Sequence, residues 1–456
     1  MEKSDVERDR IKPYEKNRLY WQYKGQPVVL LGGTVEDNIF QIPDLEEHLR
    51  LLASVGGNYA RCTLSSRDEG NVWPFERDSD SGKYDLTKPG REYWERFERC
   101  VDLAERLGII LQVELWDRFD FARGPWQRNP YNPKRNVNYS AEDSTLPKSI
   151  DAHPGRRENP FFGSVPALQS NELVLKYQRV HIDELVRRTV ARGNVLYCMD
   201  NETNEAAEWG AYWAEYLKAK MAEAGRGVEV TEMWDAHDLT EEQHRRTWEH
   251  PETYTFLDIS QNSHSPHSRH WDNMQWMRTQ VIQSGHVRPI NTVKIYGANT
   301  GKYGSGRDGQ ERFWRNIVGG LASSRFHRPP SGLGLGKRAR QHITSLRMLV
   351  ERVDVVNCEP HTDLVRERSW NEAYCTTEPG KQYAVFFPDG GDVYLDVNDA
   401  KTNVFLLWWL DIMACRWLPP ERVPGDVNLI RLRTPRDDGF WAAAVKPDLL
   451  TSTGTA

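Results

Sequence analysis

The chain has 456 residues with a formal net charge of −6, and its isoelectric point near 6.2 gives no excess of positive charge for binding nucleic acid. No apolar run approaches the roughly 20 residues that a membrane-spanning helix needs. A chain of this length has room for one large domain and one small one.

Apolar, strand-like segments alternate with amphipathic, helix-like segments through most of the chain. In residues 44–56, for example, Leu45, Leu49 and Leu52 share one helical face, and glycines end the helix. The predicted strands are 26–34, 58–66, 109–117, 194–202, 228–236, 255–264, 288–297 and 321–329, and the predicted helices are 44–56, 91–108, 172–193, 209–225, 270–285 and 310–320. These repeats predict a (β/α)8 barrel. A doubly wound open sheet is the alternative, but no Gly-rich phosphate loop follows the first strand.

Two segments break this rhythm. Residues 121–170 are rich in Pro, Asn and Arg, and they predict a long loop after the third strand, on the C-terminal face of the barrel where active sites form. After about residue 355 the helical patterns stop and short strands follow, with a hairpin turn predicted at PDGGD, 388–392. We therefore predict a catalytic barrel over 1–354 and a small C-terminal β-sandwich over 355–456, with a disordered tail at 451–456.

The cysteines and the first residues bear on the compartment. The six cysteines have no CxxC or zinc-type spacing, so buried free thiols are expected rather than a disulfide framework. The opening residues 1–10 contain no hydrophobic signal core. The protein is thus expected to be either cytoplasmic or exported with its leader removed.

Polar residues gather where the predicted strands end, which in a barrel is the functional face. They are Glu36, Asp37 and Asn38; Arg61; Glu114, Trp116, Asp117 and Arg118; Asp200, Asn201, Glu202 and Glu205; Trp234, Asp235 and His237; Asp258, Gln261, Asn262 and His264; Lys294 and Tyr296; and Arg325 and His327. Carboxylates, amides, imidazoles and indoles together suit a polyhydroxylated ligand such as a glycan. Residues 235–238 and 264–270 carry possible metal ligands, but polar loops are the better interpretation, and no metal or cofactor is predicted.

Several segments resemble one family of enzymes. NVLYCMDNE, 194–202, resembles the fourth strand of retaining glycosidases of clan A, in which an Asn-Glu pair supplies the acid/base. Residues 82–117 resemble the second helix and third strand of the same enzymes. Residues 20–34 resemble the opening of apiosidase-like and cellulase-like barrels, and residues 383–397 resemble the small sandwich behind such barrels. The resemblance implies a glycosidase with a (β/α)8 barrel and a C-terminal β-sandwich.

The resemblance also implies roles for individual residues. Glu202 matches the acid/base, and Asn201 the amide that contacts a sugar hydroxyl. Arg61 matches the arginine that steadies the nucleophile, and His264 lies near a ring-contacting position on the sixth strand. A general acid needs a raised pKa, so we expect burial or a neighbouring negative charge at Glu202.

One departure from the family pattern concerns the second carboxylate. The clan carries its nucleophile as a glutamate at the end of strand seven, but here Lys294 stands at roughly that place. Glycoside hydrolysis normally needs two carboxyl groups. Three alternatives remain. Another carboxylate acts as the second catalytic group, and the candidates are Asp37, Glu114, Asp117 and Glu311. Otherwise the protein binds glycans without cleaving them, or Glu311 folds back into the site. Glu311 alone is better explained as a helix-start acid.

Lys294 has two interpretations. It pairs with Glu202 or Asp258 as a structural partner, or it binds an acidic group of the sugar. Glu202 likewise could cap the helix that follows it. Asp200 should point to the opposite face of the strand, so a negatively charged neighbour of Glu202 would have to come from another strand.

These patterns together predict a glycoside hydrolase that degrades a plant or microbial oligo- or polysaccharide, which could be acidic. Its catalytic candidates are Glu202, Asp37 and Glu114, and its substrate-binding candidates are Arg61, Trp116, Asp117, Asn201, His264, Lys294 and Tyr296. The long third loop predicts a pocket and therefore exo-action. A non-catalytic glycan-binding protein is the alternative, and a purely structural barrel is disfavoured by the many polar strand ends.

Overall fold

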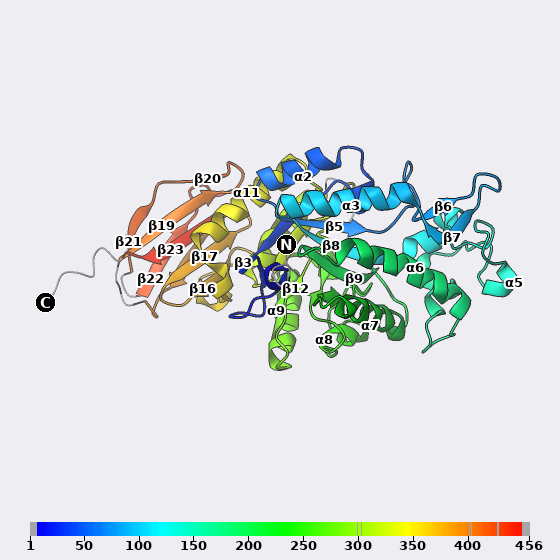
Figure 1. Ribbon diagram of the computed structural model, residues 1–456. Coiled ribbons are helices and arrows are strands. Elements are labelled where there is room, and N and C mark those ends of the chain that lie inside the picture. The colour runs from blue at the N-terminus through cyan, green and yellow to red at the C-terminus, as the bar shows by residue number, and fades with distance from the viewer. Residues whose placement is uncertain are drawn as a thin grey trace.

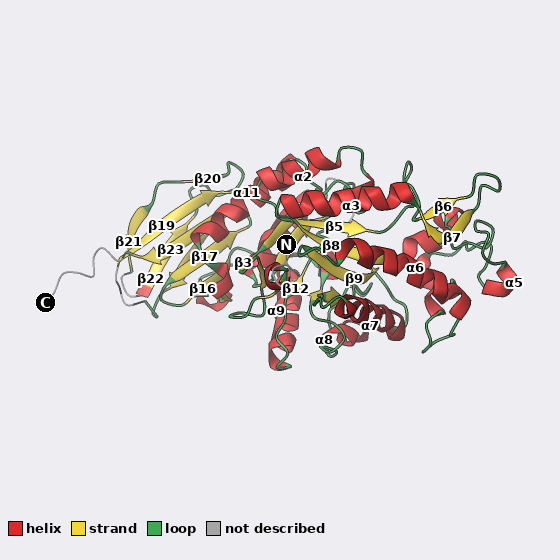
Figure 2. Cartoon of the chain, viewed as in Figure 1, coloured by secondary structure: helices red, strands yellow, loops and turns green. Residues whose placement is uncertain are grey.

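The computed structural model describes residues 7–298, 300–301, 303–400, 402, 404–425 and 428–448. The predicted disordered tail at 451–456 lies outside these residues. Figure 1 shows a barrel of strands and helices in blue to yellow, with a β-rich unit in orange and red at one end. In Figure 2 the helices lie around the barrel strands, while the β-rich unit is almost entirely strand and loop.

Eight parallel strands form the barrel in the described part of the chain, as predicted. Six run in the order β10-β9-β8-β5-β4-β13, and β11 pairs with β12. Backbone bonds join these two pieces, because Thr255 N–H donates to Val230 O over 2.9 Å and Ala322 N–H donates to Ile290 O over 3.0 Å. The strands are β4 (Leu30–Gly33), β5 (Tyr59–Thr63), β8 (Ile110–Asp117), β9 (Val195–Asn201), β10 (Val230–Thr231), β11 (Leu257–Asp258), β12 (Ile290–Asn291) and β13 (Ser323–Phe326).

The barrel strands are buried on both faces, which explains their apolar sequences. Their inward side chains form a core of their own that includes Tyr59, Ile110, Leu196, Phe256 and Val293. The connecting helices bury one apolar face against the outside of the sheet. They are α2 (Leu45–Ser54), α3 (Arg91–Arg106), α6 (Glu172–Thr189), α7 (Ala207–Glu223), α8 (Glu242–Trp248), α9 (His267–Gln283), α10 (Gly306–Val318) and α11 (Lys337–Arg352).

The long segment after β8 is ordered by its asparagines. Asn129, Asn132 and Asn136 each accept, through the side-chain oxygen, the backbone N–H two residues further on, at 2.9 to 3.0 Å. Such bonds replace the secondary-structure partners that an irregular chain lacks. The segment contains two short helices, α4 (Arg123–Arg128) and α5 (Ala141–Ser144), and β6 (Phe75–Arg77) pairs with β7 (Tyr84–Pro89) beside it. In Figure 1 these elements lie at the end of the molecule away from the sandwich.

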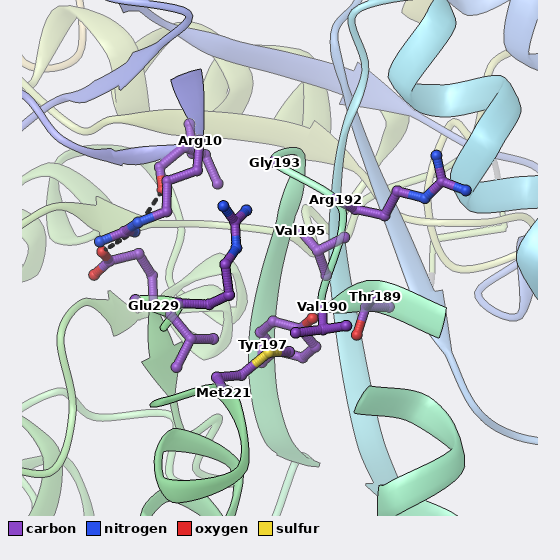
Figure 3. A pocket seen from close by; sticks show the side chains of 13 residues that line it. Arg10, Thr189, Val190, Arg192, Gly193, Val195, Tyr197, Met221 and Glu229 are labelled. Atoms are coloured by element: carbon purple, nitrogen blue, oxygen red, sulfur yellow. Dashed lines mark hydrogen bonds and ion pairs between the residues drawn. The ribbon is translucent and has the colours of Figure 1, made fainter. Parts of the chain in front are cut away.

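The N-terminal segment docks at the opposite end of the barrel from the strand carboxyl ends. It includes a small antiparallel sheet of β1 (Lys12–Pro13), β2 (Trp21–Tyr23) and β3 (Gln26–Val28). Arg10 donates to Glu229 over 2.6 Å and to Glu7 over 2.7 Å, and Figure 3 shows Arg10 and Glu229 joined while Arg192 points away. The pocket beside them holds about 20 Å³, room for about one water. Arg10 therefore anchors the N-terminal segment to the barrel.

Replacing Arg10 with methionine should lower the free energy of unfolding by about 3 kcal/mol, because it leaves the buried Glu229 carboxylate without its cation. The Arg10 side chain is only 15% exposed and that of Glu229 6%. Urea unfolding followed by circular dichroism measures the effect. Arg8→Met is the matched control, since Arg8 is 67% exposed and should change stability little. Equal urea midpoints of unfolding for Arg10→Met and Arg8→Met would contradict the role of Arg10 as an anchor.

The C-terminal unit is a β-sandwich, as predicted. A larger sheet runs in the order β14-β16-β17-β23-β19-β20 with β21 also on β19, and a smaller sheet runs β15-β18-β22. The apolar side chains of both sheets meet in one core, which includes Val385, Trp409, Leu395 and Leu432. The strands are β14 (Glu359–Pro360), β15 (Val365–Arg366), β16 (Tyr374–Glu378), β17 (Gln382–Phe387), β18 (Asp392–Asp396), β19 (Val404–Asp411), β20 (Arg416–Trp417), β21 (Glu421–Pro424), β22 (Leu429–Arg433) and β23 (Trp441–Pro447).

The predicted hairpin at 388–392 is wrong. The turn itself forms, with Gly390 at φ +65°, but β17 and β18 belong to different sheets. Both edges of β17 are already taken, by β16 and by β23, so β18 crosses to the facing sheet and pairs with β15 and β22. The other face of the larger sheet packs on the barrel, where Phe386 stacks on Trp314 of α10 at 5.2 Å.

Candidate active site

The fourth barrel strand delivers Glu202 to the mouth of the barrel. β9 ends at Asn201, and Glu202 turns the chain with a φ of +50°, in the left-handed region. A non-glycine residue rarely adopts this conformation, and such strain concentrates at functional sites. The next residue, Thr203, forms a bridge with Trp234 beside β10. The Glu202 side chain stays 13% exposed.

Lys294 and Tyr296, which follow β12, both bind the Glu202 carboxylate. The Lys294 ammonium and the Tyr296 hydroxyl donate to the same oxygen, Glu202 Oε1. Lys294 Nζ also donates to Asn201 Oδ1 over 2.8 Å. Of the two partners that the sequence offered for Lys294, Glu202 is therefore the one it contacts.

The pKa of Glu202 moves in the direction opposite to our expectation. Burial favours the neutral acid, but the Lys294 charge and the hydrogen bonds from Lys294 and Tyr296 outweigh it, so the pKa lies well below its usual value. The expectation was wrong because the charged neighbour is a cation from another strand. In this arrangement Glu202 is a carboxylate at neutral pH.

Arg61 holds two further carboxylates in the barrel mouth. Its guanidinium donates to both oxygens of Glu114, over 2.6 and 2.5 Å, and lies 2.6 Å from Asp37. Asp37 is also 3.0 Å from Arg328 and 3.5 Å from His327. Burial opposes the charged form of Asp37, but Arg61, His327 and Arg328 outweigh it and hold its pKa well below the usual range.

The two candidate second carboxylates differ in accessibility. Glu114 is fully buried and both of its oxygens are taken by Arg61, and burial raises its pKa although Arg61 opposes the rise. Asp37 lies nearer the surface, with a side chain 6% exposed. Side-chain contacts connect Asp37 to Glu202. His327 lies beside Asp37, its ring packs against the Tyr296 ring at 4.8 Å, and the Tyr296 hydroxyl binds Glu202. Asp37 is thus the better placed of the two for contact with a ligand.

Aromatic rings form one side of the barrel mouth. His264 stacks on His237 at 3.6 Å and contacts the rings of Tyr296 and Tyr303 at 4.9 and 4.8 Å. Burial, followed by the neighbouring His237, lowers the pKa of His264 to about 3, so its ring is neutral. Flat neutral rings beside a carboxylate suit the apolar face of a sugar.

The long segment after β8 closes the side of the mouth next to β9. Arg118 donates to Asn204 Oδ1 over 2.9 Å and pairs with Asp235 at 2.8 Å. Asn204 in turn donates to Gly155 O over 2.8 Å, and Arg157 donates to Asn204 O over 3.2 Å. The segment therefore packs directly on the residues that follow Glu202.

The structure places two candidates, Trp116 and Glu311, away from the mouth. Trp116 packs outside the barrel against His181, Trp209 and Trp213, at 5.2 to 5.8 Å. Glu311 does not fold back, because it is buried on α10 and binds Arg307, Arg315 and Asn371. Glu311 lies in the second turn of α10, so the expectation that it is an acid of the first helical turn was also wrong. Asp117 is buried and paired with Arg67.

Two residues of the mouth were not among our candidates. Tyr303 and Arg328 come from the segments after β12 and β13, and the sequence there shows no periodic pattern that would mark them. The one sequence signal for Arg328 was its position next to the candidate His327.

Among the described residues, no group of three or more His, Cys, Asp or Glu side chains is placed to hold a metal ion. The six cysteines are unpaired, and all but Cys415 are buried. No helix in the described ranges is long and apolar enough to cross a membrane.

A second acidic pair lies behind β9. Asp200 points away from the mouth, as predicted, and accepts a 2.7 Å bond from Trp209 Nε1 on α7. Glu232 accepts the backbone N–H groups of Asp200 and Met233 over 2.9 and 3.0 Å. No cation contacts this pair in the described part of the chain, so burial raises the pKa of Glu232 to about 8.

Replacing Glu232 with glutamine should flatten the pH dependence of stability. The folded protein keeps a proton on Glu232 that the unfolded chain releases above about pH 4.5, so wild-type stability falls as the pH rises from about 4.5 to about 8. The variant keeps the backbone bonds without this loss and should gain about 4 kcal/mol relative to wild type at pH 8. Thermal unfolding from pH 5 to 9, with exposed Glu215→Gln as control, measures it. If the unfolding temperatures of wild type and variant changed in parallel with pH, Glu232 could not be protonated in the folded protein as proposed.

Solved structures of glycoside hydrolases share this fold. A family 5 glycoside hydrolase from Bacteroides vulgatus ATCC 8482 aligns with a TM-score of 0.66 at 11% identity, covering 99% of this chain and 97% of that one. A family 5 mannosidase from Rhizomucor miehei gives 0.53 at 12%, covering 77% and 99%, and an α-amylase from Geobacillus thermoleovorans gives 0.59 at 8%, covering 92% and 98%.

No protein-family model matches the sequence, and no curated protein matches it. The likeness to the solved structures shows that this chain has the barrel fold of glycoside hydrolases.

Proposed function

We propose that the protein is a glycoside hydrolase of the clan A type, apiosidase-like, that cleaves glycosidic bonds in a plant or microbial glycan. The observation that carries this proposal is the position of Glu202 at the carboxyl end of the fourth barrel strand, beside Asn201 and within the mouth. Active sites of such barrels lie at this face.

In this proposal Glu202 is the general acid and Asp37 the second carboxylate. Asp37 is ionised, and it is held in place by Arg61, Arg328 and His327. A carboxylate in that state can take a proton from an attacking water. Glu114 then positions Arg61, because neither of its oxygens is free to meet a substrate.

Glu202 must acquire a proton before it can act as the acid. As long as Lys294 binds Glu202, the carboxylate stays ionised. The acid role therefore requires that a bound substrate weaken the contact between Lys294 and Glu202.

The substrate-binding side of the mouth is formed by Asn201, His264, Tyr296 and Lys294. The segment after β8 closes the mouth beside Asn204, and a closed side favours a pocket over an open groove. This supports exo-action, in which the enzyme removes sugars from a chain end.

The alternative is a glycan-binding protein without turnover. One observation favours it: Lys294 occupies the place of the second carboxylate and neutralises Glu202. Both functions predict glycan binding in the mouth, so only turnover separates them.

Sugar release from a panel of plant, algal and bacterial glycans tests the proposal. Wild type should release sugar from at least one glycan, and Glu202→Gln should lower that release by at least about 100-fold, while Glu215→Gln, on the exposed face of α7, keeps it. Equal release by wild type and Glu202→Gln would mean that another residue is the acid. Binding of a glycan that is never cleaved would favour the alternative.

A further inference from the structure

We propose that the barrel mouth takes a glycan whose reacting sugar carries an anionic group, and that this group replaces Glu202 as the partner of Lys294. The inference rests on the proposed hydrolase function and deepens it by naming the substrate class. A uronic-acid carboxylate and a sulfate ester share the required chemistry, because each offers negatively charged oxygens to an ammonium group.

The first support is the isolation of Lys294. Its residue is 2% exposed, and Glu202 is the only carboxylate that contacts its ammonium in the described ranges. Its other partner, Asn201, is a neutral amide. An ammonium has three N–H donors, and these two partners leave one for a ligand.

The second support is the proton that catalysis requires. If Glu202 took up a proton in the free protein, Lys294 would remain a buried cation whose ammonium contacts only neutral groups, with the carboxyl groups of Glu114 and Asp258 further away, and this is unfavourable. An anion brought by the substrate removes this penalty. Glu202 then lies beside a negative charge instead of a positive one, and both changes favour its neutral acid form.

The third support is the layout of the mouth. Glu202 is more exposed than Lys294, so its carboxylate covers the ammonium on the side that a ligand approaches. Asn201 holds Lys294 in place while Glu202 moves aside. Arg157, which is exposed, adds positive charge along the closed side, and this attracts an anionic chain.

The proton balance of the step follows from these positions. The anionic group accepts the Lys294 N–H, and Glu202 takes a proton from solvent. Glu202 gives that proton to the glycosidic oxygen as the bond to the sugar carbon breaks. A water adds its hydroxyl to that carbon and passes its other proton to Asp37.

Matched substrates test this inference. One pair is a uronic-acid glycan and its carboxyl-reduced form, and the other is a sulfated glycan and its desulfated form. Wild type should show at least a tenfold higher kcat/KM on the acidic member of one pair, and which pair it is identifies the anionic group. Lys294→Met should bring that pair within about twofold, whereas Lys294→Arg should keep part of the preference. Equal rates on both members of both pairs would overturn the inference and leave the hydrolase function standing.

A binding measurement keeps the two claims separable if no glycan is cleaved. Glucuronate, glucose 6-sulfate and glucose are titrated into the full chain and followed by NMR. Glu202→Gln removes the competitor for Lys294, so its affinity for one of the anionic sugars should rise at least tenfold over wild type, while its affinity for glucose stays unchanged. An unchanged affinity for both anionic sugars would overturn the inference, whatever the protein does to glycans.

Discussion

Glu202→Gln should lower the rate of glycan cleavage by about 10²- to 10⁴-fold, the usual contribution of a general acid. The loss should depend on the leaving group. An aryl glycoside with an acidic phenol needs no proton on the departing oxygen, so the variant should cleave it at close to the wild-type rate. Steady-state kinetics on a series of aryl glycosides measures this dependence.

The same series separates the two roles that a carboxylate can have here. If Glu202 is instead the base or the nucleophile, Glu202→Gln should lose activity on every substrate, whatever the leaving group. The ionised state of Glu202 in the free protein makes this a real alternative. A uniform loss would therefore contradict the acid role while keeping Glu202 in the reaction.

Arg61→Met should lower the free energy of unfolding by about 3–5 kcal/mol, because it removes the cation shared by two buried carboxylates. Arg61 is fully buried, and the side chains of Asp37 and Glu114 are at most 6% exposed. In the variant Asp37 keeps Arg328 at 3.0 Å, but Glu114 loses the cation that contacts it, so burial should hold the folded pKa of Glu114 further above its unfolded one. The stability of the variant should therefore rise as the pH falls toward 4, where Glu114 takes up a proton.

Thermal unfolding at pH 7 and pH 5 measures this effect. Arg91→Met is the matched control, because its side chain is 86% exposed and should change stability by less than about 0.5 kcal/mol. Adding Glu114→Gln to Arg61→Met should recover part of the loss. An equally small effect for Arg61→Met and the control would contradict the bridging role.

The barrel was predictable because each of its strands is an apolar segment followed by polar residues. The fifth, sixth and seventh strands form ladders of only two residues each, yet their apolar residues still marked them. The N-terminal sheet β1–β3 was not predicted, since its strands have only two or three residues. The hairpin at 388–392 failed because turn residues show that a chain turns but not which sheet receives the next strand.

The site was predictable only in part, for a similar reason. Local patterns placed Asn201 and Glu202 at a strand end, which needs no knowledge of other strands. The pKa of Glu202 depends on Lys294, 92 residues further along the chain, and its sign could not be read from the neighbouring residues. Trp116 failed because its strand turns it outward among Trp209 and Trp213.

The most direct test of Glu202 as the general acid is a crystal structure of Glu202→Gln with an uncleaved glycan bound. The glycan should lie in the barrel mouth, with a glycosidic oxygen within about 3 Å of the residue 202 side chain. One sugar ring should lie against His264. A glycan bound elsewhere, or bound in the mouth with no glycosidic oxygen near residue 202, would contradict the assignment of Glu202 as the acid.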